Sequence, residues 1–290
     1  MTFVSCSQEA ELTVFKAEAE SEFGKKVIKS ELIGTVHTES SVEVATGVRE
    51  SYMDFLSMRG YVTKIYAYEI DLSVSDIDVV VSTAENYNST AYKKQELTEQ
   101  ARLIDAPGNI ILGGINGDGF NATGRPKGIL IKNGTAIKTP ATNPSASYFA
   151  ITNDKKAVIG NEADLKTAGT AHLRDAIGGE DWLVLDGATM PQQVPTEDAK
   201  TAIGVAGDSK VILFVADGGN FWYSHGMTLT DVAKVMQALG AEKSIALACG
   251  KYSTFIARRD DRIILRNMPI QSTNKVIEEP VSNGIVIVKK

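Results

Sequence analysis

The chain has 290 residues, of which 43% are hydrophobic and 23% charged, and its formal net charge is −6. This length can bury the core of one large or two smaller domains, and the composition excludes wholesale disorder. Nucleic acid is not an expected partner, because no basic block or basic stripe with interspersed aromatic residues is present. The sequence also lacks an apolar run of about 18 residues, the length that a membrane-spanning helix needs.

The N-terminal segment is similar to the end of a bacterial lipoprotein signal. Small residues precede Cys6, and a polar, acidic stretch follows it. This pattern predicts an exported protein, periplasmic or on the outer surface, whose only membrane contact is a lipid anchor at Cys6; an arbitrary exposed N-terminus is the alternative. Residues 9–29 predict one amphipathic helix. We therefore place an N-terminal tether or helical segment at 1–40 and one folded domain at 41–290.

Strand signals begin at Val42 and continue to residue 81. The segments 61–70 and 77–81 are rich in β-branched and aromatic residues. Apolar residues within 61–70 do not share one parity, which predicts either a bulge or burial on both faces. Apolar residues then recur at helical spacing over 92–104, and Pro-Gly at 107–108 ends this predicted helix.

The middle of the chain predicts short strands separated by polar turns. A buried strand at 109–112 opens into a glycine-rich loop at 113–120. Asn-Gly between the apolar runs of 129–137 predicts a hairpin with a type I′ turn. A second hairpin is predicted from the runs 148–151 and 157–159.

The C-terminal half shows a more regular pattern. A helix is predicted to begin at Thr228 with Asp231 as its capping-box partner, and to end at Gly240. Strands are predicted at 182–185, 201–205, 211–216, 244–247 and 284–288. Together the segments predict an α+β fold, a mixed-sheet α/β body in which helices flank a central mixed β-sheet.

Polar residues gather in three regions next to predicted strands, where an α/β-type sheet usually presents functional loops. The first is Gly-Ile-Asn-Gly-Asp-Gly-Phe at 114–120 with Gly-Arg-Pro-Lys-Gly at 124–128, and the second is Lys-Thr-Ala-Ile-Gly at 200–204. The third combines Asp-Gly-Gly at 217–219, Ser-His-Gly-Met-Thr-Leu at 224–229 and Leu-Ala-Cys-Gly-Lys-Tyr-Ser-Thr at 247–254.

In this order the loops resemble those of the phosphodiester glycosidases, over about residues 45–288. The family patterns are Gly-x-Asn-Gly-Asp-Phe-Phe, Arg-Thr-Ala-Ile-Gly and Leu-Asp-Gly-Gly-Gly-Ser-Ser-Thr. The last loop departs from its pattern, since Ala248 replaces the acid and Cys249 and Lys251 replace two glycines. Because the family includes an enzyme that removes α-linked N-acetylglucosamine from a phosphodiester, the resemblance implies a hydrolase of sugar-1-phosphodiester bonds.

The chemistry of this bond suggests a role for each retained residue. Cleavage at the anomeric carbon builds positive charge on the sugar ring, which a nearby carboxylate stabilises. The resemblance implies Asp118 and Asp217 as these carboxylates, with Lys200 and His225 facing the phosphate and His225 as a further catalytic candidate. The expected ligand is a glycan or phosphosugar, and the remaining candidates for binding it are Asn116, Thr201, Lys251, Tyr252 and Ser253.

Each candidate also has a structural explanation. Asp118, Asp217 and the lesser candidate Asp186 lie in residue combinations typical of tight turns. His225 precedes a helix that it could simply cap. Cys249 is better explained as a small buried residue than as a nucleophile, because no orienting motif accompanies it.

No cofactor is expected, although clustered Asp and Asn oxygens leave a divalent cation such as calcium open as an alternative. Three scattered histidines argue against zinc. Besides the hydrolase, a degenerate family member that binds a glycan or phosphosugar without cleaving it remains open, because Ala248, Lys251 and Tyr252 replace family residues. A purely structural surface protein explains the retained polar loops least well.

Overall fold

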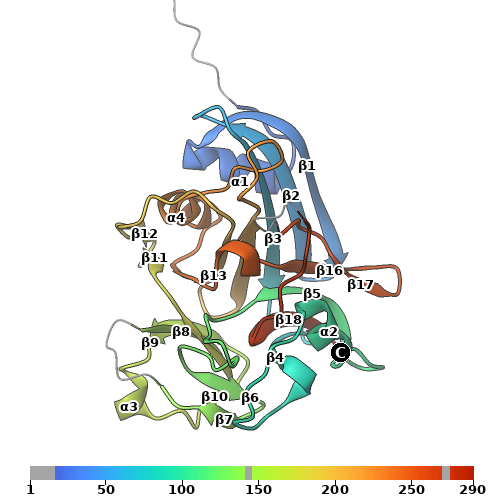
Figure 1. The fold of residues 1–290 in the computed structure, drawn as a ribbon, viewed down its shortest axis with the longest axis vertical. Coiled ribbons are helices and arrows are strands. Elements are labelled where there is room, and N and C mark those ends of the chain that lie inside the picture. Colours follow the sequence, from blue (N-terminus) through green and yellow to red (C-terminus); the bar gives the residue numbers. More distant parts are fainter. Residues whose placement is uncertain (1–16, 141–145, 270–274) are drawn as a thin grey trace, which may run out of the picture.

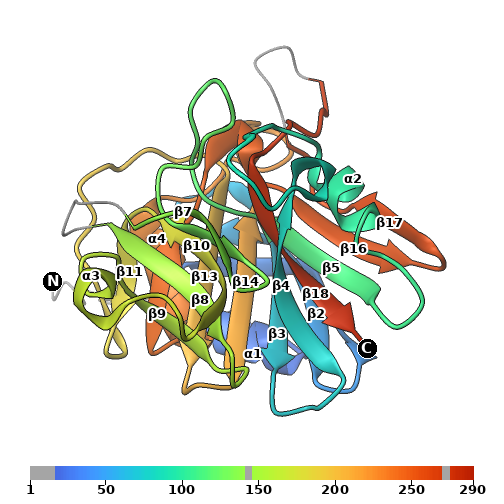
Figure 2. The same cartoon turned by 90° about the horizontal axis from the view of Figure 1, so that it is seen from below.

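In the computed structural model, which describes residues 17–140, 146–269 and 275–290, three β-sheets surround a shared core (Figures 1 and 2). The largest sheet has eight strands, in the order β1 (Ile33–Ala45), β2 (Val48–Ser57), β3 (Val62–Asp71), β14 (Lys210–Ala216), β13 (Lys200–Ala206), β15 (Lys243–Ala246), β11 (Trp182–Leu185) and β12 (Ala188–Thr189).

The two smaller sheets have five strands each. One has the order β7 (Thr135–Lys138), β6 (Leu130–Lys132), β10 (Leu173–Gly179), β8 (Ser147–Thr152) and β9 (Ala157–Asn161). The other has the order β17 (Arg262–Leu265), β16 (Phe255–Arg259), β5 (Ile110–Asn116), β18 (Asn283–Lys289) and β4 (Ile77–Thr83).

The predicted α+β class is confirmed only in part. Strands make up 47% of the described residues and helices 13%, so this part of the molecule is predominantly β. The prediction of a mixed sheet is wrong for the described residues, because every strand pair is antiparallel. Parallel neighbours need long crossover connections, usually helical, whereas here short turns join β1 to β2, β13 to β14 and β16 to β17.

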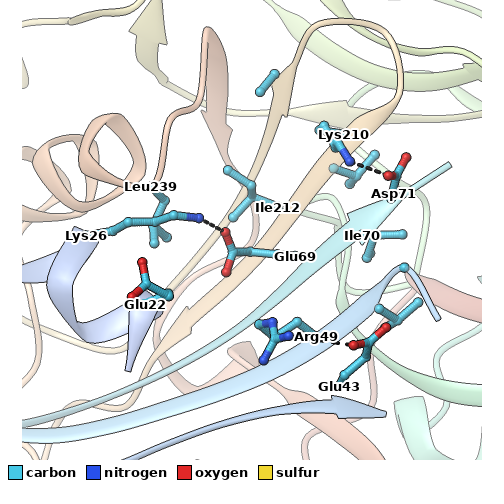
Figure 3. Close-up of a pocket in the computed structure, with 14 residues that line it drawn as sticks. Glu22, Lys26, Glu43, Arg49, Glu69, Ile70, Asp71, Lys210, Ile212 and Leu239 are labelled. Atoms are coloured by element: carbon cyan, nitrogen blue, oxygen red, sulfur yellow. Dashed lines mark hydrogen bonds and ion pairs between the residues drawn. The ribbon is translucent and has the colours of Figure 1, made fainter. Parts of the chain in front are cut away.

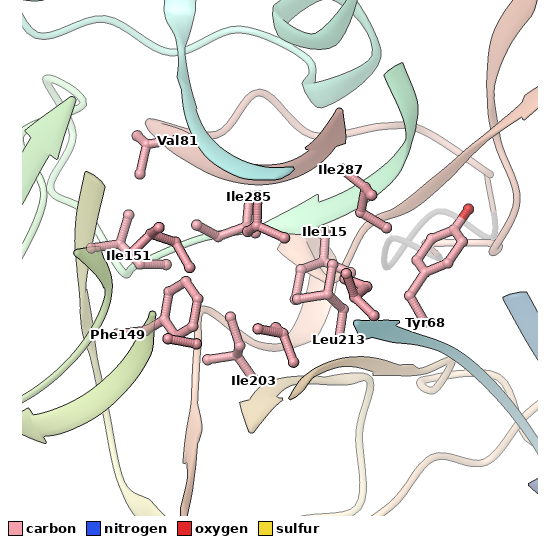
Figure 4. Packing of buried hydrophobic residues seen from close by; sticks show 14 of the residues in the cluster. Tyr68, Val81, Ile115, Phe149, Ile151, Ile203, Leu213, Ile285 and Ile287 are labelled. Carbon is pink, nitrogen blue, oxygen red and sulfur yellow. The ribbon is translucent and has the colours of Figure 1, made fainter. Parts of the chain in front are cut away.

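The main core lies between the eight-stranded sheet and the two smaller sheets (Figure 4). All three sheets contribute, for example through Leu213, Ile285 and Phe149. Strand β3 is buried on both faces: Tyr66 and Tyr68 face this core, and alternate residues face the second one. The predicted two-sided burial is therefore confirmed, and the pairing of β3 with both neighbours shows no register shift.

Helices cover the other face of the eight-stranded sheet (Figure 1). These are α1 (Glu22–Val27), continued by the 3₁₀ turn η1 (Ile28–Ser30), and α4 (Leu229–Ala238). The predicted capping box of α4 is confirmed, since Asp231 N donates to Thr228 Oγ1 at 3.1 Å and Thr228 N donates to Asp231 Oδ2 at 3.0 Å. No helix in the described ranges has the length and apolar composition needed to cross a membrane.

Most predicted strands and hairpins are present. Asn133 and Gly134 both have positive φ, at 48° and 74°, as a type I′ turn between β6 and β7 requires. The remaining elements are short: η2 (Ala84–Asn86), α2 (Leu97–Arg102), α3 (Leu165–Ala168) and η3 (Gly250–Tyr252).

Helix predictions were too long in two places. The helix predicted at 92–104 is only α2, because Gln95 instead pairs in an antiparallel bridge with Val281 and Glu96 caps the helix. The helix predicted at 9–29 is only α1 and η1 in the described residues, and residues 17–20 are not helical. Residues 9–16 and Cys6 lie outside the described ranges, so the lipid anchor stays a prediction.

Strand predictions were too short in two places. Strand β1 begins at Ile33, well before Val42, and the domain boundary placed after residue 40 falls inside it. The sequence hides β1 because many of its side chains are polar and only one residue is fully buried, which leaves little hydrophobic alternation. Strand β5 likewise continues through Asn116, so residues 113–116 belong to the sheet and not to a loop.

Candidate active site

Loops from several strands meet at one edge of the molecule. In an antiparallel pair, the start of one strand lies beside the end of its neighbour, so the beginning of β13 is adjacent to the end of β15. Three backbone hydrogen bonds tie the loops together: Ala248 N to Gly117 O at 3.0 Å, Gly250 N to Ala199 O at 2.8 Å, and Glu180 N to Ala246 O at 2.8 Å.

Asn116, at the end of β5, is completely buried and holds these loops in place. Its Oδ1 accepts hydrogen bonds from Thr201 Oγ1 and Thr254 N, both at 2.9 Å, and its Nδ2 donates to Ala248 O at 2.8 Å. The sequence predicts that Asn116 and Thr201 bind sugar hydroxyls. In the structure their side chains bind each other and the protein's own loops.

Asn116→Ala is expected to lower the free energy of unfolding by about 3 kcal/mol or more, because it leaves the Thr201 hydroxyl, the Thr254 N–H and the Ala248 carbonyl buried without this partner. Urea denaturation measures the loss. Asn88→Ala, at an exposed loop position, is the matched control and should change stability by less than about 0.5 kcal/mol. A small effect at Asn116 would mean that these loops are held by other contacts.

Asp118 lies just beyond β5 and is almost completely buried. Its Oδ2 accepts a hydrogen bond from Gly128 N at 2.6 Å, while its Oδ1 has no hydrogen-bond partner among the described residues. Burial, with repulsion from Glu180 and Glu162, raises the pKa of Asp118 to about 7, although the Gly128 N–H and the charge of Lys138 act in the opposite direction. Asp118 is therefore a carboxyl group that can hold a proton near neutral pH.

Glu162, just after β9, is a buried residue of this region that the sequence did not reveal. Its Oε1 accepts a hydrogen bond from Ile129 N at 2.5 Å. Gly128 separates the two carboxylates: a Cβ atom there would collide with Glu162 Oε1 and lie 3.4 Å from Asp118 Oδ2. Glu162 stands in a polar turn sequence without a motif, so only the fold shows that it lies near Asp118.

Charged side chains surround Cys249, which replaces a family glycine. The charges of Lys200, Glu180 and Asp198 act on its thiol, and Lys127 pairs with Glu180 at 2.9 Å. Lys127 and Glu180 both lie over Gly119, the residue that follows Asp118. Burial raises the pKa of the Cys249 thiol to about 11, so the neutral thiol prevails near pH 7 and a cysteine nucleophile is disfavoured.

Lys200 and Asp198 approach Cys249 from the start of β13. Lys200 is 6% exposed, and within the described part of the chain its ammonium group forms no hydrogen bond or ion pair. Asp198 is half-buried, and its Oδ1 accepts a hydrogen bond from Ala199 N at 2.7 Å. Its other oxygen lies 3.1 Å from the position that a Cβ atom of Gly250 would take, so this carboxylate lies over the altered loop. The sequence did not single out Asp198.

Asp217, after β14, lies in a buried network that reaches the altered loop through Asn267, whose Nδ2 also donates to Ser253 O at 2.9 Å. Its Oδ1 accepts a hydrogen bond from Asn267 Nδ2 at 2.8 Å, and Met268 N donates to its Oδ2 at 3.0 Å. The hydroxyl groups of Tyr66 and Tyr223 also bind it. Burial raises the pKa of Asp217 to about 6 against these hydrogen bonds. The structure thus gives this carboxylate protein partners on both oxygens.

His225 lies outside the group around Cys249. Its Nε2 is 2.5 Å from Glu197 Oε2, and its ring stacks on Tyr61 with centroids 4.1 Å apart. Glu197 also pairs with Arg59 at 2.8 Å. Of the four residues on which the sequence prediction centred, Lys200 pairs with Ala216, the neighbour of Asp217, in the β13–β14 ladder. Asp118 lies beyond the end of β5, and the His225 ring is engaged with Glu197 and Tyr61.

The last three candidates lie on the loop after β15. Lys251 is exposed and lies 3.6 Å from Glu279, and Tyr252 packs edge-on against Phe120 with ring centroids 5.0 Å apart. Ser253 is completely buried, and its Oγ has no hydrogen-bond partner among the described residues. Lys251 and Tyr252, the two of these side chains that are not completely buried, therefore both contact other side chains of the protein.

A cavity of about 440 Å³ lies away from these loops, between α1 and the eight-stranded sheet (Figure 3). Ion pairs join its charged lining: Lys26 with Glu69, Lys210 with Asp71, and Arg49 with Glu43. None of the predicted site residues lines it. Among the described residues, no group of three or more His, Cys, Asp or Glu side chains is arranged to hold a metal ion.

Comparison with known proteins identifies one family whose sequence model matches and several structures with a similar fold. The sequence model of the phosphodiester glycosidase family matches residues 109–288. The fold is similar to the catalytic domain of zebrafish N-acetylglucosamine-1-phosphodiester alpha-N-acetylglucosaminidase, auto-inhibited by its pro-peptide, with a TM-score of 0.67 and 18% identity over 89% of both chains. It is also similar to a hypothetical protein from Synechocystis, with a TM-score of 0.61 and 12% identity over 87% of this chain and 64% of the other. No curated protein sequence matches the chain.

Proposed function

This chain belongs to the phosphodiester glycosidase family, and we propose that it hydrolyses sugar-1-phosphodiester linkages at the anomeric carbon. The observation that carries the proposal is that two unlike carboxyl groups border the converging loops, Asp118 just beyond β5 and Asp198 over Gly250, with Lys127 over Gly119 next to Asp118. Asp118 is buried with a raised pKa, whereas Asp198 is accessible to solvent. Pairs of carboxyl groups in different environments commonly divide the acid and the charge-stabilising roles of glycoside cleavage.

In this proposal Asp118 provides the proton and Asp198 stabilises the positive charge that develops on the sugar ring. Asp198 thereby takes over the role of the acidic residue that Ala248 has replaced, because its carboxylate lies over the same loop. Lys200 lacks an anionic partner in the described residues, and the largely exposed Lys127, paired with Glu180, can exchange this partner for the phosphate group in the proposal. Two cationic groups stabilise a phosphate monoester as it leaves.

The proposal is tested with N-acetyl-α-D-glucosamine 1-(methyl phosphate) in ¹⁸O-labelled water. Attack at the anomeric carbon should release free sugar together with methyl phosphate that carries no label, as mass spectrometry of the methyl phosphate determines. Label in the methyl phosphate would show cleavage at phosphorus and contradict a glycosidase. Absence of turnover for this diester and for others with different sugars, over pH 4–9, would contradict hydrolysis altogether.

A second function is favoured by one observation. No residue of the loop 247–254 carries a carboxylate, and Ala248 is only 4% exposed. A chain without the family acid could bind a phosphosugar without cleaving it. Calorimetric binding of the methyl diester without turnover would support this binding function over the hydrolase.

A further inference from the structure

The turn after β14 carries two of the most exposed aromatic residues of the described chain. Trp222 is 86% exposed and Phe221 is 54% exposed. Their rings contact each other edge-on, with centroids 5.0 Å apart. Isolated apolar residues on a surface are ordinary, but adjacent aromatic rings directed at solvent typically mark a binding surface.

These rings belong to a larger cluster, which we call the aromatic platform: Tyr61, Phe221, Trp222 and His225. Phe221 packs edge-on against Tyr61 and His225, with centroids 5.9 Å and 5.7 Å apart, and Tyr61 stacks on His225. The platform therefore joins the turn to the beginning of β3. Neighbouring rings fix its position in the absence of a ligand.

The backbone of the turn is also held in place. Asn220 Oδ1 accepts hydrogen bonds from Trp222 N and Tyr223 N, both at 3.0 Å, and Ser224 N donates to Asn220 O at 2.8 Å. Ser224 Oγ in turn donates to Asp217 O at 2.7 Å. Because the turn is ordered before binding, a ligand does not lose affinity to the ordering of this segment.

The platform adjoins the group around Cys249 through Asp198. One carboxylate oxygen of Asp198 lies 3.4 Å from the Cβ position of Gly219, and the other lies 3.1 Å from that of Gly250. Gly219 precedes Trp222 by three residues, which span at most about 10 Å of chain. A ligand that occupies the region of Asp198 therefore extends to Trp222 if it has one further ring.

Polar groups border the rings. Glu197 lies within ion-pair distance of both His225 and Arg59, and Arg59 also pairs with Asp231 at 2.6 Å. A pyranose ring has an apolar C–H face and a rim of hydroxyl groups, so it matches an aromatic surface with carboxylate and guanidinium groups at its edge.

We propose that the aromatic platform is a second carbohydrate subsite, which stacks a neutral pyranose ring of the ligand beyond the ring that is bound near Asp118 and Asp198. This proposal rests on the proposed function, since it assigns an extended saccharide to the same site. Phe221 and Trp222 supply the stacking surface. Glu197 and Arg59 face the hydroxyl groups.

The test uses the fluorescence of Trp222 itself. The chain has two tryptophans, and Trp182→Phe leaves Trp222 as the only one. Titration of this variant with N-acetylglucosamine oligomers of one to four units should shift and quench its emission, more strongly with the longer oligomers. In the natural background, Trp222→Ala should raise the calorimetric Kd of the four-unit oligomer at least about tenfold. Trp222→Phe should recover most of the affinity. Leu103→Ala, at the exposed apolar C-cap of α2, is the control and should leave the Kd unchanged.

Binding is measured without turnover, so the subsite and the proposed function fail separately. An unchanged emission with every oligomer, or equal affinity of Trp222→Ala and the natural chain, overturns the subsite even if the methyl diester is hydrolysed. A shift that depends on protein concentration alone, accompanied by dimers in analytical ultracentrifugation, assigns the platform to a contact between two copies and also overturns it. So does a shift produced by phosphatidylglycerol vesicles and not by the oligomers.

Discussion

Asp118→Asn is expected to lower kcat for the methyl diester about 10³-fold, because it removes the proton that the leaving phosphate or the attacking water exchanges with this side chain. The folded structure should persist, since the asparagine oxygen still accepts the hydrogen bond from Gly128 N. For the natural chain, kcat should fall as the pH rises through about 7, where the buried carboxyl group loses its proton.

The same substitution has an effect on stability that needs no substrate. The folded-state pKa of Asp118 is raised from 3.8 to about 7, so its favourable contribution is complete below about pH 4 and is lost as the pH rises through 7. Asp118→Asn removes this dependence, and at pH 8 the variant should be more stable than the natural chain by on the order of a few kcal/mol. Urea denaturation at pH 4, 6 and 8 measures the difference.

Asp260→Asn is the matched control for both effects. Asp260 lies in the exposed turn between β16 and β17 with a φ of 52°, a conformation that asparagine also adopts readily. This variant should retain kcat and stability at all three pH values. Full activity of Asp118→Asn would remove Asp118 from the mechanism. If the difference in stability between Asp118→Asn and the natural chain is the same at pH 4 and at pH 8, the carboxyl group of Asp118 is not the buried acid described above.

Local sequence signals predicted much of the fold. The Asn133-Gly134 turn, the capping box of α4 and the two-sided burial of β3 each depend on residues that are close in sequence, and each was found. The all-antiparallel pairing was not predicted, because it depends on which distant strands become neighbours. Strand β1 was mostly missed because an exposed edge strand needs few apolar residues.

The candidate site was predicted in part for a similar reason. The motifs located the loops that converge, and the charge of Lys200 acts on the Cys249 thiol. They could not show that the side chains of Asn116 and Thr201 hydrogen-bond to each other, since this contact between β5 and β13 depends on the tertiary fold. The sequence does not predict Glu162 and Asp198 as site residues, because neither lies in a recognisable motif.

The altered loop changes what family membership implies for this chain. Ala248, Cys249 and Lys251 remove an acid and two small residues, yet Asn116 still binds the backbone of the loop through Ala248 O. The frame of the loop is thus retained while its charge is lost. Asp198, just before β13, lies over Gly250 of that loop, so in the proposal it supplies the carboxylate that position 248 lacks.

Asp198→Asn is therefore expected to lower kcat for the methyl diester about 10²- to 10³-fold, because in the proposal this carboxylate stabilises the charged sugar ring. Adding Ala248→Asp to Asp198→Asn should restore at least about a tenth of the activity, since it returns an acid to the position that the family uses. Steady-state kinetics of both single variants and the double variant measure the coupling, with Asp208→Asn, in the exposed β13–β14 turn, as the control. If the natural chain is inactive and Ala248→Asp with Cys249→Gly and Lys251→Gly is active, the chain is a binding protein that has lost catalysis. If Asp198→Asn is fully active, the carboxylate was not relocated, and the positive charge must be stabilised from elsewhere in the site.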